Sequence, residues 1–126
     1  MKKLILIIED DQIFRAIIFD LLELENFNVI SAQDGFLGLK LAKQFKPDLI
    51  LCDINIPQLN GYGVLNRLRE DSTIAKTPFI FLTSDSDTES RSQAMQLGAN
   101  DYLTKPVKFS TLLDAIDNQF NQLYSV

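Results

Sequence analysis

Five short apolar runs divide the chain, and they alternate with segments whose apolar residues recur at helical spacing. Short apolar runs bounded by turn residues are typical of buried strands, whereas recurrence every three or four residues indicates a helix. The expected strands cover residues 4–8, 28–32, 49–52, 79–82 and 101–103.

The expected helices are amphipathic, each with a stripe of apolar side chains that would face a sheet. The first carries Ile13, Ile17, Leu21 and Leu24; in the second, Phe36, Leu39 and Lys43 fit the helical period and Leu41 and Ala42 join the apolar face. The others are marked by Val64, Leu65 and Leu68, by Ala94 and Leu97, and by Leu112, Leu113, Ile116, Phe120 and Leu123.

Turn and capping residues fall between these elements. Asp34-Gly35 and Asn60-Gly61 are turn signals, and Gly98 stands where the end of a helix would be capped. Ser86, followed three residues later by Glu89, resembles a capping box at the start of the fourth helix.

A strict βα alternation repeated five times demands a parallel sheet with right-handed crossovers and helices on both faces. The predicted fold class is therefore α/β, a doubly wound five-stranded parallel sheet. A site then belongs at the carboxyl ends of the strands, near the point where strand order reverses. The chain has 126 residues and no linker or low-complexity tract, so we expect a single domain over residues 1–126 with no output domain attached.

Composition narrows the classes of function. The net charge of -5 argues against direct nucleic-acid binding, for which a basic face is the usual footprint. No apolar stretch approaches the roughly 20 residues that span a bilayer, so we expect a cytoplasmic protein without membrane insertion. The absence of histidine removes a Ser-His-Asp or Cys-His site, and the single cysteine, Cys52, falls in an apolar run where a buried, inert thiol is expected.

Acidic residues follow two of the predicted strands. Glu9 and Asp10 come directly after the first strand, and Asp53 comes directly after the third. If these strands are parallel neighbours, the three carboxylates converge, and each raises the pKa of the others unless a cation lies among them. Oxygen ligands that are few and partly hydrated suit Mg2+, and the backbone carbonyl of Asn55 could complete the set. Asp53 is then a candidate phosphoryl acceptor, although an aspartate at a strand end also commonly caps the next turn.

Polar groups that suit a phosphoryl group follow the fourth and fifth predicted strands. Thr83 comes after residues 79–82, and Lys105 comes shortly after residues 101–103. A hydroxyl and an ammonium at these strand ends could bind phosphoryl oxygens, with the lysine acting as a point charge. Each residue alone is an ordinary turn or surface residue, but compatible groups at four strand ends form a much more specific pattern.

With these residues the chain resembles a response-regulator receiver domain of two-component signalling, of the stand-alone chemotaxis-regulator kind, over essentially its whole length. The resemblance implies a flavodoxin-like (βα)5 fold with strand order 2-1-3-4-5. It assigns the acidic pair to Glu9 and Asp10, the phosphorylated aspartate to Asp53, the metal-ligating carbonyl to Asn55, the switch hydroxyl to Thr83, the switch aromatic to Tyr102 and the invariant lysine to Lys105. It also implies a cis peptide bond between Lys105 and Pro106.

Two positions depart from the usual pattern of that family. Glu9 stands where aspartate is commoner, which alters how a metal-bound water is held, and Val107 follows Lys105-Pro106 where phenylalanine is frequent. Neither change removes a group that the chemistry needs.

The resemblance implies a phosphoacceptor switch that is not an enzyme beyond its own phosphorylation and dephosphorylation. A sensor histidine kinase or histidine phosphotransfer protein donates a phosphoryl group from phosphohistidine to Asp53, while Mg2+ and Lys105 neutralise charge on the transferring oxygens. Thr83 then moves inward and Tyr102 rotates. The face formed by the fourth helix, fifth strand and fifth helix changes shape, for a downstream protein target or for onward phosphotransfer.

Other functions remain open at this stage. A Mg2+-dependent phosphohydrolase would use Asp53 as nucleophile, but such enzymes commonly carry a second aspartate where this chain has Asn55. A pure interaction module would keep the fold and ignore phosphorylation, although every expected site group is present. A flavodoxin-type flavin site is disfavoured, because no Ser/Thr-rich loop follows Ile8 and the acids there would repel a phosphate.

Overall fold

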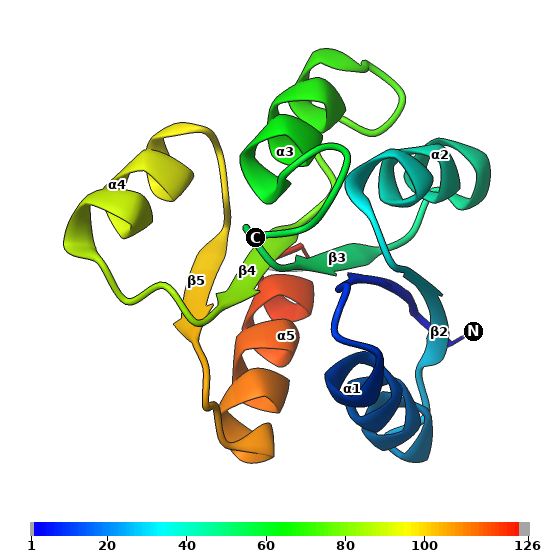
Figure 1. Cartoon of the computed structure of the whole chain (residues 1–126). Helices are drawn as coiled ribbons and strands as arrows, with labels where there is room; N and C mark the ends of the chain where they lie inside the picture. The colour runs from blue at the N-terminus through cyan, green and yellow to red at the C-terminus, as the bar shows by residue number, and fades with distance from the viewer. Residues whose placement is uncertain (1, 124–126) are drawn as a thin grey trace.

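Strands and helices alternate strictly along residues 2–123, which are the residues that the computed structural model describes, with side chains described as far as Asn121 (Figure 1). The elements in chain order are β1 (Leu4–Ile8), α1 (Gln12–Leu24), β2 (Asn28–Ala32), α2 (Gly35–Phe45), β3 (Leu49–Cys52), α3 (Gly61–Glu70), β4 (Phe79–Thr83), α4 (Thr88–Gln96), β5 (Asp101–Thr104) and α5 (Phe109–Leu123). The strand predictions are confirmed, and β4 and β5 each extend one residue further than predicted, to Thr83 and Thr104.

The described strands form one parallel sheet in the order β2-β1-β3-β4-β5. The predicted flavodoxin-like topology is therefore confirmed. The order reverses between β1 and β3, which are adjacent, with Ile8 paired to Cys52 at their carboxyl ends. This pairing brings the residues that follow β1 and β3 to one point on the edge of the sheet.

Two separate apolar cores lie on the two faces of the sheet, because successive residues of a strand point to opposite sides. Leu6 and Ile8 face the core under α2, α3 and α4, which also takes Phe79 and Phe81. Their strand neighbours, Ile5 and Ile7 among them, face the core under α1 and α5. Figure 1 shows the same division, with α1 and α5 on one side of the sheet and α2, α3 and α4 on the other.

The buried face of α1 is not the predicted one. Ile13, Ile17 and Leu24 are exposed by 75%, 50% and 81%, whereas Ile18 and Leu22 are buried against the sheet. The helix is apolar around most of its circumference, so periodicity alone offers two stripes. Packing against the sheet selects the stripe that contains Ile18 and Leu22. In α2 the predicted face is correct for Leu39 and Ala42, but Phe36 is 47% exposed.

Asparagine and aspartate side chains define where several helices begin. The turn signals at Asp34 and Asn60 are helix N-caps, because these side chains accept hydrogen bonds from Leu37 N at 2.8 Å and Gly63 N at 3.0 Å. The capping box predicted at Ser86 is wrong: Asp87 is the N-cap of α4, with its Oδ1 accepting from Glu89 N at 3.0 Å. A carboxylate is the better acceptor for these free N–H groups and the helix begins one residue later.

Glycine is required at two positions next to these helices. Gly98 follows Leu97, the C-cap residue of α4, with φ +102°, the left-handed conformation that glycine adopts at little cost, which confirms the predicted cap. At Gly61 an added Cβ would lie 2.4 Å from the Asp53 backbone oxygen. The absence of a side chain at Gly61 therefore lets the start of α3 pack directly against the end of β3.

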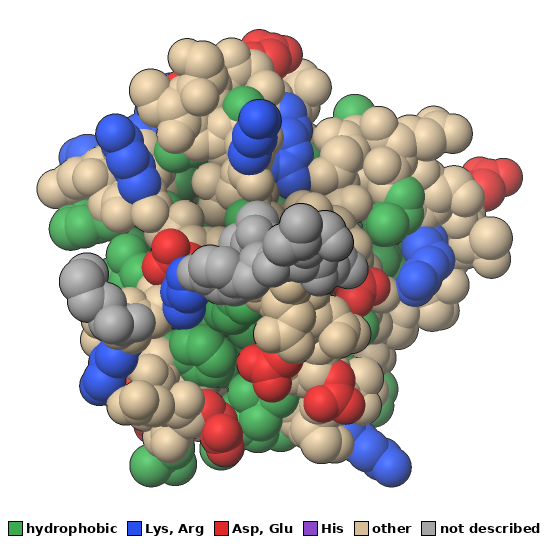
Figure 2. Space-filling view, turned by 180° about the vertical axis from the view of Figure 1, so that it is seen from behind, with side chains coloured by type: hydrophobic (Ala, Val, Ile, Leu, Met, Phe, Trp, Pro, Cys, Tyr) green, Lys and Arg blue, Asp and Glu red, His purple; other side chains and the backbone are tan. Residues whose placement is uncertain are grey.

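On the face seen in Figure 2, basic and acidic side chains of the described residues are both present, with hydrophobic and neutral ones among them. Among the described residues, no helix is long and apolar enough to cross a membrane.

Candidate functional site

Three carboxylates converge where β1 and β3 end. One oxygen each from Glu9, Asp10 and Asp53 lies within 4.8 Å of the others. The backbone holds the strand ends together, since Asp53 N donates to the Ile8 carbonyl at 3.0 Å. Glu9 is 3% exposed and Asp53 is 8% exposed, whereas Asp10 faces solvent. The predicted convergence of the three acids is confirmed.

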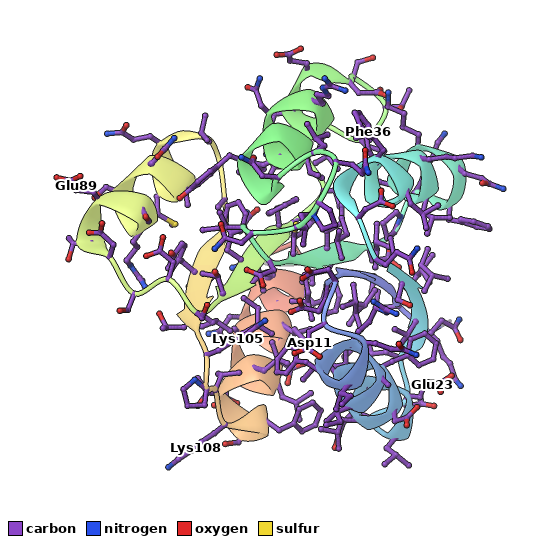
Figure 3. The ribbon with its side chains drawn as sticks, in the orientation of Figure 1. Asp11, Glu23, Phe36, Glu89, Lys105 and Lys108 are labelled. Atoms are coloured by element: carbon purple, nitrogen blue, oxygen red, sulfur yellow. The ribbon has the colours of Figure 1, made fainter. Side chains whose placement is uncertain are left out.

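Lys105 reaches this acidic cluster from the segment after β5 (Figure 3). Its Nζ forms an ion pair with Glu9 Oε1 and lies 3.2 Å from Asp53 Oδ2. Lys105 N donates to the Thr83 carbonyl at 2.7 Å, which ties this segment to the end of β4. The Lys105-Pro106 peptide bond is cis, as predicted.

Burial and the neighbouring charges have opposite effects on the pKa values of Glu9 and Lys105. Burial raises the pKa of Glu9 above its usual range, although the hydrogen bond from Lys105 and the Asp11 N–H oppose that effect. For Lys105, burial alone would lower the pKa, but the hydrogen bond to Glu9 and the charge of Asp53 outweigh burial and raise it. The ammonium is therefore held in its charged form between two carboxylates.

The donor set fits a hard divalent cation. Glu9, Asp10 and Asp53 offer only oxygen atoms, and the single ammonium of Lys105 leaves the four groups with an excess of negative charge. The exposed Asp10 carboxylate leaves the site open to water ligands, which Mg2+ usually keeps. Glu9, Asp10 and Asp53 could hold Mg2+, and Lys105 would add a second positive charge beside Asp53.

The two carboxylate oxygens of Asp53 have different surroundings. Oδ1 accepts hydrogen bonds from Ile54 N at 2.7 Å and, more weakly, from Asn55 N at 3.4 Å. Oδ2 faces Lys105. Asp53 therefore does cap the turn that follows it, and its second oxygen is still directed into the site. The Asn55 residue lies in this turn, directly beside the acids.

Thr83 and Tyr102 meet at the loop after β4. The Thr83 side chain is fully buried, and its Oγ1 accepts from Asp85 N at 3.3 Å. Tyr102 is 2% exposed and its hydroxyl donates to the Asp85 carbonyl at 2.6 Å. Burial, reinforced by the nearby Asp85 carboxylate, raises the pKa of Tyr102 to about 12. In this structure the Tyr102 ring is in the buried position, 6.1 Å from the Phe81 ring.

Several residues that contact the site were not indicated by any sequence motif. The Phe14 ring lies against the Lys105 ammonium, 4.3 Å from Nζ to the ring centroid. Arg15 Nη1 donates to the Glu9 carbonyl at 2.7 Å, and Arg91 Nη1 donates to the Tyr102 carbonyl at 2.9 Å. These contacts join separate elements, so motif spacing could not indicate them. Only the position of Phe14 and Arg15 directly after the acidic loop hints at their proximity.

Cys52 is buried one residue before Asp53, as predicted. It is 1% exposed, and its thiol donates to the Asp53 carbonyl at 3.1 Å. Burial raises the pKa of this thiol well above its usual range, and the charges of Asp53 and Glu9 add to the effect. A neutral, inaccessible thiol is unreactive.

Comparison with known proteins places this fold and site in one family. Residues 5–117 match the model of the response regulator receiver domain. A probable transcriptional regulator ycf27 of Porphyridium aerugineum is 40% identical over 105 residues, 83% of this chain and 42% of that protein. Protein PilH of Pseudomonas aeruginosa is 36% identical over 113 residues, 90% of this chain and 93% of that protein.

A solved structure shows the same architecture. The receiver domain of sensor histidine kinase PA1611 from Pseudomonas aeruginosa, with a magnesium ion coordinated in its active site cleft, is 29% identical. It superimposes with a TM-score of 0.86 over 94% of this chain and 97% of that one. The chain thus belongs to the response regulator receiver domain family, whose general function is that of a phosphoacceptor switch. It spans roughly half or less of the length of several curated relatives that it matches, including the ycf27 proteins and RpaA of Synechocystis.

Proposed function

We propose that Asp53 accepts a phosphoryl group from the phosphohistidine of a sensor histidine kinase or histidine phosphotransfer protein. The observation that carries this proposal is the convergence of the Glu9, Asp10 and Asp53 carboxylates, together with the 3.2 Å approach of Lys105 Nζ to Asp53 Oδ2. An Asp53 oxygen forms a bond to phosphorus while the phosphorus–nitrogen bond of the donor breaks. The bonding electrons return to the donor imidazole, and Asp53 becomes an acyl phosphate.

Each polar group of the site has a part in this transfer. Glu9, Asp10, Asp53 and the Asn55 carbonyl are the proposed Mg2+ ligands, and the bound ion would supply positive charge to the phosphoryl oxygens. Lys105 is already within reach of Asp53 Oδ2, at 3.2 Å, and offers a second positive charge. Because transfer spreads negative charge over the phosphoryl oxygens, fixed positive charge is what lowers its barrier. The same groups would support hydrolysis of the acyl phosphate by water.

We propose that Thr83 and Tyr102 transmit the modification. The Thr83 hydroxyl, now bonded to the Asp85 N–H, would turn to a phosphoryl oxygen and carry the loop after β4 with it. In that loop, the Asp85 carbonyl already accepts a hydrogen bond from the Tyr102 hydroxyl. Phosphorylation would therefore stabilise the buried position of Tyr102 relative to others and change the face formed by α4, β5 and α5. A downstream protein target, or a protein that takes the phosphoryl group onward, would bind there.

Residues 1–126 would act as one receiver domain, since the family model matches residues 5–117 and the described strands form one sheet. We propose no direct nucleic-acid contact for this domain, because its net charge is -5. Phosphohistidine donors are charged from ATP, so the proposed location is the cytoplasm.

Intact-mass measurement after incubation with Mg2+ and acetyl phosphate tests the proposal. A labile added phosphoryl group on the wild type, absent from Asp53→Asn and from samples with excess chelator, is the expected result. Asp114→Asn, which removes an exposed carboxylate of α5, is the matched control and should behave as wild type. Continuous turnover of acetyl phosphate without accumulation would indicate a phosphohydrolase instead. No modification under any condition would indicate an interaction module.

A further inference from the structure

Phe14 lies where an aromatic ring can act on the proposed chemistry. It is the third residue of α1, half-buried, and packs on the edge of the core under α1 and α5. The Lys105 ammonium lies 4.3 Å from the centre of its ring. That distance is well within the roughly 6 Å over which the face of an aromatic ring attracts a cation.

The Phe14 ring is a third contact of the Lys105 ammonium, in addition to Glu9 and Asp53. Lysine carries its charge on four rotatable carbons, so two carboxylates alone leave its ammonium free to move toward solvent. Here Glu9 and Asp53 form ion pairs with the Lys105 ammonium, Phe14 faces it as well, and 18% of the Lys105 side chain is exposed. Unlike a third carboxylate, the ring attracts the ammonium without adding a negative charge that would repel a phosphoryl group.

The position of the ring is fixed by the start of α1. Asp11 Oδ1 accepts hydrogen bonds from Ile13 N at 3.0 Å and Phe14 N at 3.1 Å. The next residue, Arg15, is bonded through its side chain to the Glu9 carbonyl at 2.7 Å. The turn that carries Phe14 is thus joined to the backbone that carries Glu9, and both contact Lys105.

We propose that Phe14 is a positioning residue for phosphoryl transfer, holding the Lys105 ammonium against the phosphoryl oxygens by a cation–π contact. This inference rests on the proposed function of Asp53 as phosphoacceptor. It assigns Phe14 a role beyond filling the core, and the two roles predict different results when Lys105 is also changed.

A double-mutant cycle separates the two roles. Phe14→Leu keeps an apolar side chain and removes the ring, and it should slow phosphorylation by acetyl phosphate and Mg2+ about two- to thirtyfold, the range of one cation–π contact. Phe14→Tyr restores the ring face and should restore the rate. In a Lys105→Ala background, Phe14→Leu should leave the residual rate unchanged, because the group through which the ring acts is gone.

Phe19→Leu is the matched control. Phe19 belongs to the same helix and packs against the same core, so this substitution removes a comparable ring without touching Lys105. It should leave the rate at the wild-type value. Thermal melts of all variants establish that they are folded under the conditions of the assay.

A measurement on the unmodified protein keeps the inference testable if Phe14→Leu does not fold. The ε-methylene protons of Lys105 should resonate upfield of those of the other lysines, because the ring current of Phe14 shields them. An unshifted resonance would overturn the contact. A rate for Phe14→Leu equal to wild type, or an equal loss with and without Lys105, would overturn the positioning role. If the wild type takes up no phosphoryl group, the proposed function fails, whereas the ring-current shift still reports on the contact itself.

Discussion

The Tyr102 hydroxyl donates a 2.6 Å hydrogen bond to the Asp85 carbonyl, and this contact joins β5 to the loop that follows β4. The Asp85 N–H is bonded at 3.3 Å to the hydroxyl of Thr83. The backbone of one loop residue therefore connects the two proposed switch residues. A shift of Thr83 would therefore move the hydrogen-bond partner of Tyr102 without any direct contact between their side chains.

Removing the Tyr102 hydroxyl should destabilise the fold. Tyr102→Phe keeps the ring in its buried position but leaves the Asp85 carbonyl without this donor, at an expected cost of about 1 kcal/mol. Urea unfolding measures the change. Tyr62→Phe, which removes a longer 3.2 Å bond to the Ser90 carbonyl, is the comparison and should cost less. An unchanged midpoint for Tyr102→Phe would show that the contact contributes nothing to stability.

Tyr102 should ionise at a higher pH than a free tyrosine, and the stability of the fold should therefore fall at alkaline pH. Its pKa rises from 10.0 to about 12 on folding, chiefly because of burial. The unfolded chain therefore loses this proton first, and the contribution of Tyr102 is present below pH 10 and is lost as pH rises toward 12. Phenolate absorbance of the wild type minus that of Tyr102→Phe, recorded with circular dichroism, isolates this group. Ionisation centred at pH 10 in the folded protein would contradict the prediction.

Mg2+ should stabilise the folded chain. An ion that binds only the folded state adds about 1.4 kcal/mol at ten times its dissociation constant. Differential scanning calorimetry with and without Mg2+ measures the shift in melting temperature. Asp10→Asn should reduce the shift and raise the melting temperature without metal, because Asp10 adds a third carboxylate that has no contact with Lys105 among the ion pairs described. A wild-type melting temperature that ignores Mg2+ would count against the metal site.

Thr83→Ala should leave modification of Asp53 possible but remove its effect on the face formed by α4, β5 and α5. The variant keeps the acids and Lys105, so it should still bind beryllofluoride as a mimic of the phosphoryl group. The coupling free energy between two sites is usually about 1 to 3 kcal/mol. The coupling between Asp53 and the face around Tyr102 should be lost when the Thr83 hydroxyl is removed. Amide NMR of the wild type should show shifts near Asp53 and also along α4, β5 and α5, whereas the variant should shift chiefly near Asp53. Equal distant shifts in both proteins would show that the signal takes another route.

The sequence was sufficient to predict the positions of the acids and of Lys105. Adjacent parallel strands bring their carboxyl ends together, and the strand order that the family resemblance implies makes β1 and β3 neighbours, so the residues after Ile8 and Cys52 meet. The same reasoning placed Thr83 at the end of the next strand. These predictions depend on chain order and strand direction, which short apolar runs reveal well.

What the sequence could not predict depends on side chains that meet across elements. Ile13 and Ile17 satisfy helical periodicity as well as Ile18 and Leu22 do, and only packing against the sheet selects the second pair. The contact of Phe14 with Lys105 joins residues 91 positions apart, and no local pattern indicates it. The start of α4 was misplaced at Ser86 because two acceptors compete there, and Asp87 makes the bond.

Locating the transferred phosphoryl group tests the central claim most directly. Borohydride reduces an aspartyl phosphate to homoserine, so a protein phosphorylated by a phosphohistidine donor, then reduced and digested, carries a mass label at the modified residue. The prediction is a homoserine at position 53, with none at Asp10 or at the exposed Asp114 control, and no label when Mg2+ is removed. A label at another residue, or none after incubation with donors that phosphorylate other receiver domains, would contradict the assignment of Asp53 as the phosphoacceptor.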